Sequence, residues 1–187
     1  MEGAEKLIFN ETFAAPGYWD LGENEFSNIF IEQERLVVQM KQAGAIAWTL
    51  NGSVGHDFFY QADVAVGPCR LGDNFGLVFR SQSNGQRYFF ALSCDGQYRV
   101  TQQQAENFHD LINFTFTPYA TTGSNSTNLL AVRAVGGQLG FYINDQFVAT
   151  LANADPAPGI FGIFARSAET SDLRVEFDDI SAWEIKP

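Results

Sequence analysis

Two arginines, Arg80 and Arg99, have the side chains in this sequence that best suit recognition of a polar ligand. A guanidinium group is planar and offers a fork of N–H donors that can bind two neighbouring oxygens at once. Hydrogen-bonding and aromatic side chains recur at alternate positions nearby, and with the arginines they give eight residues: Trp48, Phe59, Gln61, Asp63, Arg80, Phe89, Gln97 and Arg99. Sugar hydroxyls need paired hydrogen-bonding groups, and the C–H faces of sugar rings stack on aromatic rings. These residues are therefore a candidate carbohydrate-binding set; ordinary cross-strand pairs on a wet sheet face are the alternative interpretation.

Alternation along three segments, Asp57–Val66, Asn74–Arg80 and Gln97–Val100, separates apolar side chains from this mixed polar and aromatic set. Successive side chains of a β-strand point to opposite faces of the sheet, so residues two apart share a face. Arg80 and Arg99 both fall on the polar side by this count. We expect the three segments to be neighbouring strands, with the apolar side in the core and the polar side on the outer, concave face of a curved sheet.

Short alternating runs separated by turn residues predict an all-β chain. Four turns carry residues that tolerate positive φ, as tight hairpins require: Ser83-Asn84-Gly85, Asp95-Gly96, Gly136-Gly137 and Asn144-Asp145. We expect these hairpins to form one meander. Asn28–Met40 is expected to be a further hairpin that turns near Glu34, and Gln102–Asp110 to hold either a helical turn or a loop.

The composition limits the class of protein and its partners. The length of 187 residues suits one domain, over 1–187 with an ordered core from about 7 to 185, and 45% hydrophobic residues allow a large core. The formal net charge of −11 repels phosphate backbones and anionic lipids, which argues against nucleic acid and membrane surfaces as partners. No stretch approaches 18 apolar residues, the length that would predict a transmembrane helix.

The two cysteines, Cys69 and Cys94, lie near the ends of two expected neighbouring strands. Two thiols are too few for a metal site, because His56 and His109 do not stand at metal-ligand spacing from them. Buried free thiols and a disulfide are the two remaining interpretations, and the disulfide is favoured. A disulfide indicates an oxidising compartment, so we expect an extracellular or cell-surface location, with any leader or anchor outside this chain.

Five segments carry a family resemblance: Asn74–Arg80, Tyr88–Val100, Gly140–Asp145, Gly159–Ala165 and Val175–Ile180. They resemble the strands of laminin-G-like and bacterial concanavalin A-like domains, including those grouped with 3-keto-disaccharide hydrolases. The resemblance covers about residues 10–185 and implies a two-sheet antiparallel jelly-roll sandwich. It is specific for the fold and not for function, because such sandwiches include lectins, glycanases and adhesion domains.

The resemblance also directs attention to carboxylates. Glucanases of this fold carry Glu-x-Asp-x-Glu on one strand, and no such triplet occurs here; Glu176 and Asp178 share a face but read as a solvated strand edge. Related sandwiches often bind calcium through a C-terminal carboxylate and N-terminal oxygens, which makes Asp178 with Asn10 or Glu11 the candidate Ca²⁺ ligands. Asp73-Asn74 is a second candidate, and neither set has the spacing of a dedicated calcium loop.

Three hypotheses for function follow. The first is a non-catalytic extracellular carbohydrate-binding or ligand-sensing module, whose partner is a glycan or another cell-surface ligand. The second is a structural or adhesive subunit that pairs with other copies of itself. The third is a glycoside-processing enzyme of the 3-keto-disaccharide hydrolase type, against which the missing carboxylate triplet argues.

Overall fold

The computed structural model describes residues 4–152 and 154–186, and these form fifteen β-strands in two antiparallel sheets. One sheet has nine strands: β1 (Ala4–Glu11), β2 (Gly22–Glu23), β3 (Ser27–Glu32), β4 (Arg35–Met40), β6 (Phe58–Val66), β11 (Thr127–Val135), β12 (Gln138–Ile143), β13 (Gln146–Leu151) and β15 (Arg174–Ile185). The other has six: β5 (Ile46–Gly55), β7 (Asn74–Ser81), β8 (Arg87–Ser93), β9 (Gln97–Gln104), β10 (Asn107–Phe116) and β14 (Gly159–Arg166).

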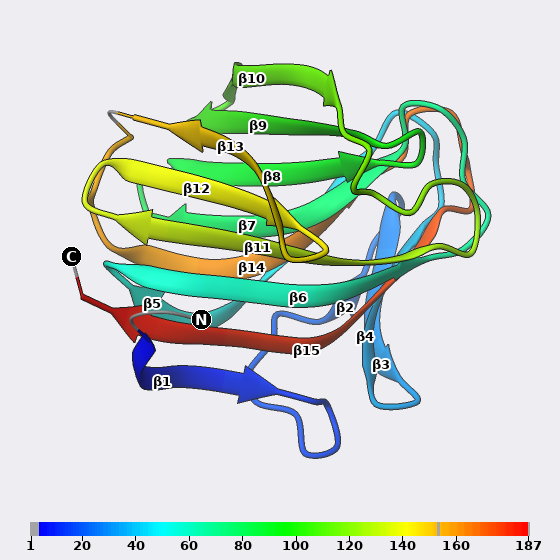
Figure 1. The fold of residues 1–187 in the computed structure, drawn as a ribbon. Coiled ribbons are helices and arrows are strands. Elements are labelled where there is room, and N and C mark those ends of the chain that lie inside the picture. Colours follow the sequence, from blue (N-terminus) through cyan, green and yellow to red (C-terminus); the bar gives the residue numbers. More distant parts are fainter. Residues whose placement is uncertain (1–3, 153, 187) are drawn as a thin grey trace.

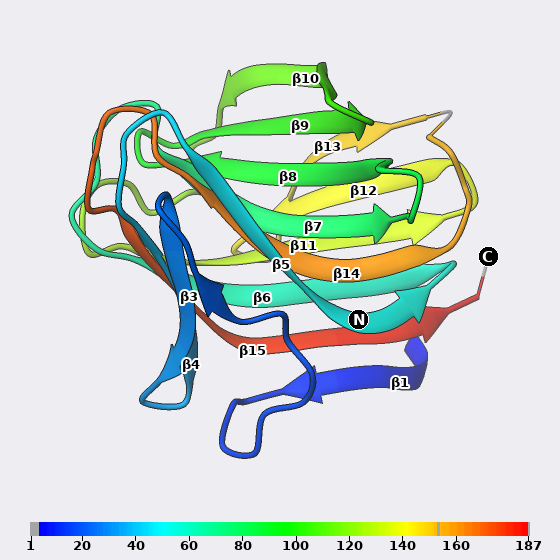
Figure 2. The same cartoon turned by 180° about the vertical axis from the view of Figure 1, so that it is seen from behind.

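The two sheets stack face to face, as the opposite views in Figures 1 and 2 show. The nine-stranded sheet runs in the order β13-β12-β11-β6-β15-β4-β3-β2, with β1 paired to β15, and the six-stranded sheet runs β10-β9-β8-β7-β14-β5. The predicted all-β, two-sheet antiparallel sandwich is therefore confirmed. Within the described residues, no helix is long and apolar enough to cross a membrane.

The predicted turns are present, but they belong to two meanders rather than one. The first two connect β7, β8 and β9 in the six-stranded sheet, whereas the other two connect β11, β12 and β13 in the nine-stranded sheet. The hairpin near Glu34 joins β3 and β4, and Gln33 and Glu34 both have positive φ. Gln102–Asp110 holds no helical turn: it is the hairpin between β9 and β10, and Ala105 in its turn has a φ of 52°.

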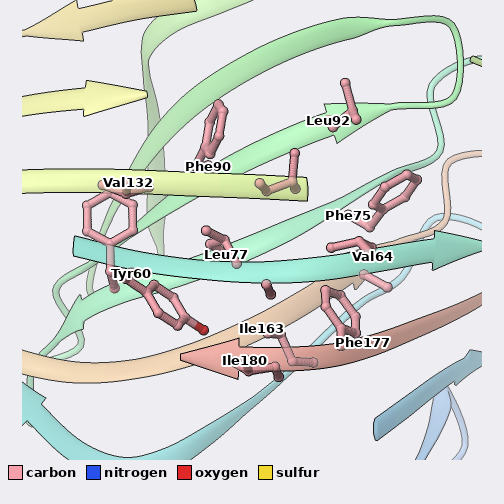
Figure 3. Packing of buried hydrophobic residues seen from close by; sticks show 14 of the residues in the cluster. Tyr60, Val64, Phe75, Leu77, Phe90, Leu92, Val132, Ile163, Phe177 and Ile180 are labelled. Carbon is pink, nitrogen blue, oxygen red and sulfur yellow. The ribbon is translucent and has the colours of Figure 1, made fainter. Parts of the chain in front are cut away.

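The core lies between the sheets and is filled by aromatic and branched side chains from both (Figure 3). Phe58 and Tyr60 of β6 meet Phe161 of β14 with ring centroids 4.8 and 4.9 Å apart. The Tyr60 hydroxyl donates a hydrogen bond of 2.8 Å to the Gly162 carbonyl, which satisfies its polar group at full burial. The even-numbered residues of β6 are buried and point into the core, and the odd-numbered ones point outward.

A β-bulge interrupts the pairing of β7 with β14. Ile160 pairs with Ser81 and Gly162 with Val78, so two residues of β7 lie opposite the single residue Phe161. Arg80 sits in this bulge with a φ of 49°, and its side chain is fully buried. The alternation of β7 therefore ends one residue before Arg80, which turns inward instead of outward.

Two glycines of the six-stranded sheet lie where neighbouring backbones approach closely. A Cβ on Gly76 would lie 2.0 Å from the Phe90 carbonyl oxygen, and one on Gly162 would lie 2.2 Å from that of Thr49. Neighbouring backbones occupy the space that a side chain would need, so only glycine fits at either position. Both glycines lie near the middle of the sheet, on β7 and β14.

Cys69 and Cys94 form a disulfide with their Cα atoms 6.3 Å apart. The bond fastens the loop before β7 to the end of β8. Asp73, fully buried in that loop, accepts hydrogen bonds from the Arg70 and Ala168 backbone N–H groups and from the Thr170 hydroxyl. This end of the six-stranded sheet is therefore held by both covalent and polar links.

Candidate functional site

The outer face of the six-stranded sheet, here called the concave face, carries a second apolar cluster that is separate from the core. Val78, Phe89, Ala91 and Phe164 are buried there. Ile46, Trp48 and Leu50 of β5 pack against them from one edge. Alternation explains the cluster, because the intervening residues of β7, β8 and β14 point into the core.

Contacts across this face show that it is curved. The Trp48 and Phe89 rings are 6.4 Å apart, and the Arg87 guanidinium carbon lies 4.9 Å from the Trp48 ring centroid. Trp48 is on β5, whereas Arg87 and Phe89 are on β8, and β14 and β7 lie between those strands. Flat strands at this separation would be about 14 Å apart, so these long side chains lean toward one another over β14 and β7, as a concave surface favours.

Strand β10 forms the other rim of the concave face. The Phe108 ring lies 5.9 Å from that of Phe89, and the Arg99 guanidinium carbon lies 4.4 Å from the Phe114 ring centroid. Asp110 stands 3.7 Å from Arg99 and accepts a hydrogen bond from the Thr101 hydroxyl. The rim thus offers half-exposed rings beside a charged pair.

The arginines of the concave face are unevenly compensated. Burial lowers the pKa of Arg99, Asp110 raises it again, and the nearby charge of Arg166 lowers it further. Burial also lowers the pKa of Arg87, and no ion pair or side-chain hydrogen bond within the described residues offsets this. The face therefore holds positive charge in a partly dehydrated setting, where a charge interacts more strongly than in water.

Buried polar atoms without a partner gather on the same face. Among the described residues, six side chains have such an atom, and four of them lie on outward positions of β7, β8 and β9: Asn74, Arg87, Arg99 and Gln103. Buried polar groups in folded proteins are nearly always hydrogen-bonded. Their concentration marks this face as one with unused hydrogen-bonding capacity.

Solved structures of other proteins share this architecture. The chain is similar to the carbohydrate-binding module CBM66 from Bacillus subtilis (19% identity, TM-score 0.69, 90% of this chain and 96% of that one). It is also similar to the β-glucanase of Bacillus licheniformis (8% identity, TM-score 0.69, 97% and 99%) and to a Bacillus subtilis protein with a galectin-like fold (11% identity, TM-score 0.71, 100% of both). The fold is a concanavalin A-like jelly roll. At these identities the likeness concerns the fold alone. No protein-family model matches the sequence, and no curated protein matches it either.

The jelly roll brings together only half of the predicted carbohydrate-binding set. Trp48, Phe89 and Arg99 lie on the concave face, and Gln97 lies at its end, where it donates a hydrogen bond of 2.6 Å to Asp95. The other four predicted residues lie elsewhere. The prediction of one continuous face is therefore wrong.

Phe59, Gln61 and Asp63 are on β6, which belongs to the nine-stranded sheet. Their side chains point away from the core on the opposite side of the molecule, where Phe59 packs against the Trp183 ring at 6.3 Å. The alternation of β6 was predicted correctly, but alternation does not tell which sheet a strand joins. Burial and the charges of Asp179 and two further aspartates raise the pKa of Asp63.

Arg80 is inside the molecule, so its predicted place on the concave face is wrong. The bulge in β7 turns its guanidinium toward three loop carbonyls, those of Asp155 (2.7 Å), His56 (3.2 Å) and Gly136 (2.7 Å). Burial lowers the pKa of Arg80, and the nearby Tyr88, Asp57 and Asp155 partly offset this shift. Arg80 therefore fastens the loops at one end of the sandwich.

Arg87, Phe164 and Arg166 lie on the concave face and were not among the predicted residues. Phe164 and Arg166 stand two apart on β14, so alternation alone places them on one face. Arg87 is the first residue of β8, one position before the start that the sequence indicated. Phe108 of β10 was missed because Gln102–Asp110 was expected to hold a helical turn or a loop.

Two of the predicted calcium ligands, Glu11 and Asp178, have side chains that are engaged with the protein itself. Asn10 and Glu11 lie on β1 opposite Ser181 and Ile180 of β15. The Glu11 carboxylate accepts hydrogen bonds from the Phe13 and Gly17 backbone N–H groups, at 2.9 and 2.7 Å, and from the Trp19 indole at 3.4 Å. Glu11 thereby holds the loop that follows β1.

Asp178 and Asp73 have similar local partners. Asp178 accepts a hydrogen bond from the Asp179 backbone and lies 3.8 Å from Arg35, and Asp73 caps its own loop as described above. Within the described residues, no three His, Cys, Asp or Glu side chains form a group that could hold a metal ion. Calcium binding remains a prediction.

Proposed function

We propose that this jelly roll is a non-catalytic carbohydrate-binding or ligand-sensing module, and that its ligand lies on the concave face. The observation that carries the proposal is the partly exposed ring of Trp48, which packs against the buried rings of Phe164 and Phe89 and lies on the same face as the donor groups of Arg87 and Arg99. Rings supply stacking surfaces for sugar C–H faces, and guanidinium groups supply paired donors for their oxygens. A known protein of the same fold is named a carbohydrate-binding module, and others are named glucanases, which supports a saccharide as the ligand class.

The carboxylates of the concave face support a binding role rather than catalysis. In the described strands, Asp110 is the one carboxylate at an outward position of this sheet, and it pairs with Arg99. Glycoside hydrolysis by the usual mechanism needs two carboxyl groups across the scissile bond. Turnover of a keto-glycoside or a β-glucan by the purified chain, followed by reducing-end release, would refute the non-catalytic assignment.

The disulfide supports an extracellular or cell-surface location as part of this proposal. Disulfides such as Cys69–Cys94 persist in oxidising compartments and are rare in the cytosol. The acidic surface is compatible with a ligand at the cell exterior. Fractionation of the native host with an antibody to the chain would test this location, and recovery in the cytosol alone would contradict it.

The test of the binding proposal compares two tryptophans. Trp48 lies on the concave face, whereas Trp183 lies on the outer face of the nine-stranded sheet. Removal of a stacking ring should weaken saccharide binding by about 2- to 10-fold in Trp48→Ala, because ring contacts contribute about 0.5–1.5 kcal/mol. Trp183→Ala should bind as the wild type does.

The measurement is a glycan array followed by calorimetry on the hits, with and without calcium. Calcium-dependent binding would support the predicted metal site, and calcium-independent binding would argue that the metal has no part in recognition. Equal loss of affinity in both tryptophan variants, or no binding to any saccharide, would contradict the proposal.

Strand β10 favours a second candidate function, assembly with other copies of the chain. It is the edge strand of its sheet, and four of its large apolar residues are at least 37% exposed: Phe108, Leu111, Phe114 and Phe116. An exposed apolar edge strand is a template for pairing with another strand. Sedimentation over a range of concentrations tests this, because Phe116→Lys should dissociate any oligomer, whereas a strictly monomeric wild type would refute assembly.

A further inference from the structure

Arg87 differs from Arg80 and Arg99 because, within the described residues, its guanidinium has neither an ion pair nor a side-chain hydrogen bond. Burial lowers the pKa of Arg80, Arg87 and Arg99 alike. Arg80 donates to three carbonyls, and Arg99 has the carboxylate of Asp110. Within the described residues, Arg87 forms no ion pair and no side-chain hydrogen bond, and its Nε is buried without a partner.

The position of Arg87 is held by an aromatic ring instead of an acceptor. Its guanidinium lies over Trp48, 4.9 Å from the ring centroid, and therefore spans the concave face from β8 to β5. A cation over an indole face gains energy from the ring but keeps its N–H donors free in the plane of the guanidinium. Arg87 thus presents donors beside the same ring that a sugar would stack on.

Two neighbouring groups add to this capacity. Gln103 lies directly across from Arg87 in the β8–β9 pairing, and its buried Oε1 has no partner among the described residues. The Arg99 Nε is likewise buried and unpartnered, although its Nη1 lies near Asp110. These buried atoms lie just beneath the surface of the face, and a ligand that shifts the side chains could reach groups that the protein leaves unsatisfied.

The charges around the concave face favour an anion. Arg87, Arg99 and Arg166 are three of the chain's 11 basic residues, and they share one face of a protein with a net charge of −11. The facing carboxylate is that of Asp110, which Arg99 already offsets, and Asp95 lies in the turn beyond, where Ser93 and Gln97 donate to it. Positive charge without compensation on an acidic protein is electrostatically complementary to an anionic ligand.

We propose that the concave face binds an anionic saccharide, whose carboxylate or sulfate group pairs with Arg87 while its ring stacks on Trp48. This inference rests on the proposed carbohydrate-binding function and specifies its ligand class. A planar carboxylate or a sulfate accepts two N–H bonds from one guanidinium, which would satisfy the orphaned donors of Arg87. Binding also displaces the contact between Arg87 and Trp48, so it should change the fluorescence of that tryptophan.

The experiment titrates the whole chain with three matched probes. Tetragalacturonate carries carboxylates, its methyl ester has the same sugar without the charge, and a sulfated galactan tetrasaccharide carries sulfates. Calorimetry should show that at least one charged probe binds 10-fold or more tightly than the neutral ester, and that its affinity falls as salt is raised. The two charged arms identify whether a carboxylate or a sulfate is preferred.

Three variants then locate the site. Arg87→Gln should lose 10-fold or more of the affinity for the charged probe, and Arg87→Lys should lose less because it keeps the charge but not the fork. Arg133→Gln makes the same charge change on the nine-stranded sheet and should bind as the wild type does. Unchanged thermal unfolding in each variant shows that the fold is intact.

The fluorescence signal has its own control. Trp19 is buried beside Glu11 and Trp183 lies on the other sheet, so the change on binding should disappear in Trp48→Phe. Equal affinity for tetragalacturonate, its ester and the sulfated probe, or equal losses in Arg87→Gln and Arg133→Gln, would overturn the anionic assignment. Binding of neutral glycans alone would overturn this inference and leave the proposed function standing, whereas no saccharide binding at all would overturn both.

Discussion

The arginines on the outer faces of the two sheets differ in how they form ion pairs. On the nine-stranded sheet, Arg35 and Arg174 both pair with Glu176, at 2.9 and 2.8 Å, and Arg174 also pairs with Glu32 at 2.6 Å. On the concave face, Arg99 has one carboxylate at 3.7 Å, and Arg87 has none within the described residues. Within the described residues, Arg35 and Arg174 of the first face therefore form close ion pairs and Arg133 forms none, whereas on the concave face only Arg99 has a carboxylate partner and neither Arg87 nor Arg166 forms an ion pair.

The distribution of carboxylates sharpens this contrast. Asp63 of β6 lies opposite Asp178 of β15 in the sheet, and the charges of Asp179, Asp178 and Asp145 all raise the pKa of Asp63. The excess of acid therefore gathers on the nine-stranded sheet, away from the concave face. A net charge of −11 says nothing of this segregation, and it is the local charge that a ligand meets.

The largest expected effect is on stability, where substitution of Arg80 should cost far more than substitution of Arg87. Arg80→Met leaves the carbonyls of His56, Gly136 and Asp155 without their donor, so it should lower the free energy of unfolding by about 3–5 kcal/mol. Arg87→Met removes only the contact with Trp48 and should change stability by less than about 1 kcal/mol.

Urea unfolding followed by far-UV circular dichroism measures both changes. The wild type and the two variants are compared by midpoint and slope, since an unchanged slope shows that the same surface is exposed on unfolding. Similar losses in the two variants would show that Arg87 also has a structural role, and the contrast between the two faces would then weaken.

The next effect concerns the glycines that shape the two sheets. A Cβ on Gly76 would meet the Phe90 carbonyl oxygen at 2.0 Å, whereas the nearest atom to a Cβ on Gly140, in the nine-stranded sheet, is 3.5 Å away. Gly76→Ala should therefore destabilise the protein by about 1–3 kcal/mol, and Gly140→Ala should lie within about 0.5 kcal/mol of the wild type.

Calorimetric Tm values test this pair, and saccharide titration of the same samples adds a functional measure. Gly76→Ala should also weaken binding, because the shift of β8 would flatten the concave face. A Tm for Gly76→Ala that equals that of Gly140→Ala would mean that the curvature does not depend on this glycine.

Local pattern predicted much of this fold and only half of the site. Alternation identified the inward and outward residues of β6 and β9, and turn residues marked the hairpins. Strand partnership was not accessible in the same way, because the sheet that a strand joins depends on long-range pairing. For that reason Asp63 and Arg99 were expected on one face and lie on opposite sides of the molecule.

The prediction for Arg80 was wrong for a different reason. The bulge that turns it inward adds one residue to β7 relative to β14, and nothing in the short run around it marks the extra residue. The phase of alternation changes at such a point, so every assignment beyond it is reversed. Phe164 was accessible to the same alternation argument, whereas Arg87 lies one residue before the segment Tyr88–Val100 that the sequence indicated.

The smallest expected effects test the carboxylates of the nine-stranded sheet, where two acids are shifted in opposite directions. Burial raises the pKa of Glu176, but hydrogen bonds and charges from Arg174 and Arg35 outweigh this and lower it below 4.5. Burial and neighbouring aspartates instead raise the pKa of Asp63 above 3.8. At neutral pH the charged form of Glu176 therefore stabilises the fold, and the charged form of Asp63 destabilises it.

Glu176→Gln should lower the free energy of unfolding at pH 7 by up to about 1 kcal/mol, a small value because Arg35 is well exposed to solvent. The full destabilisation by this substitution should be present above pH 4.5, and it should vanish as the pH falls through the lowered pKa of Glu176.

Asp63→Asn should raise Tm slightly at pH 7, and this gain should disappear as the pH falls through the raised pKa of Asp63 toward 3.8. Thermal unfolding of both variants between pH 2.5 and pH 8 distinguishes the two signs. A shift of the same sign for both would show that the acids on this face are not individually compensated, and the contrast with the concave face would then lie in the number of charges and not in their pairing.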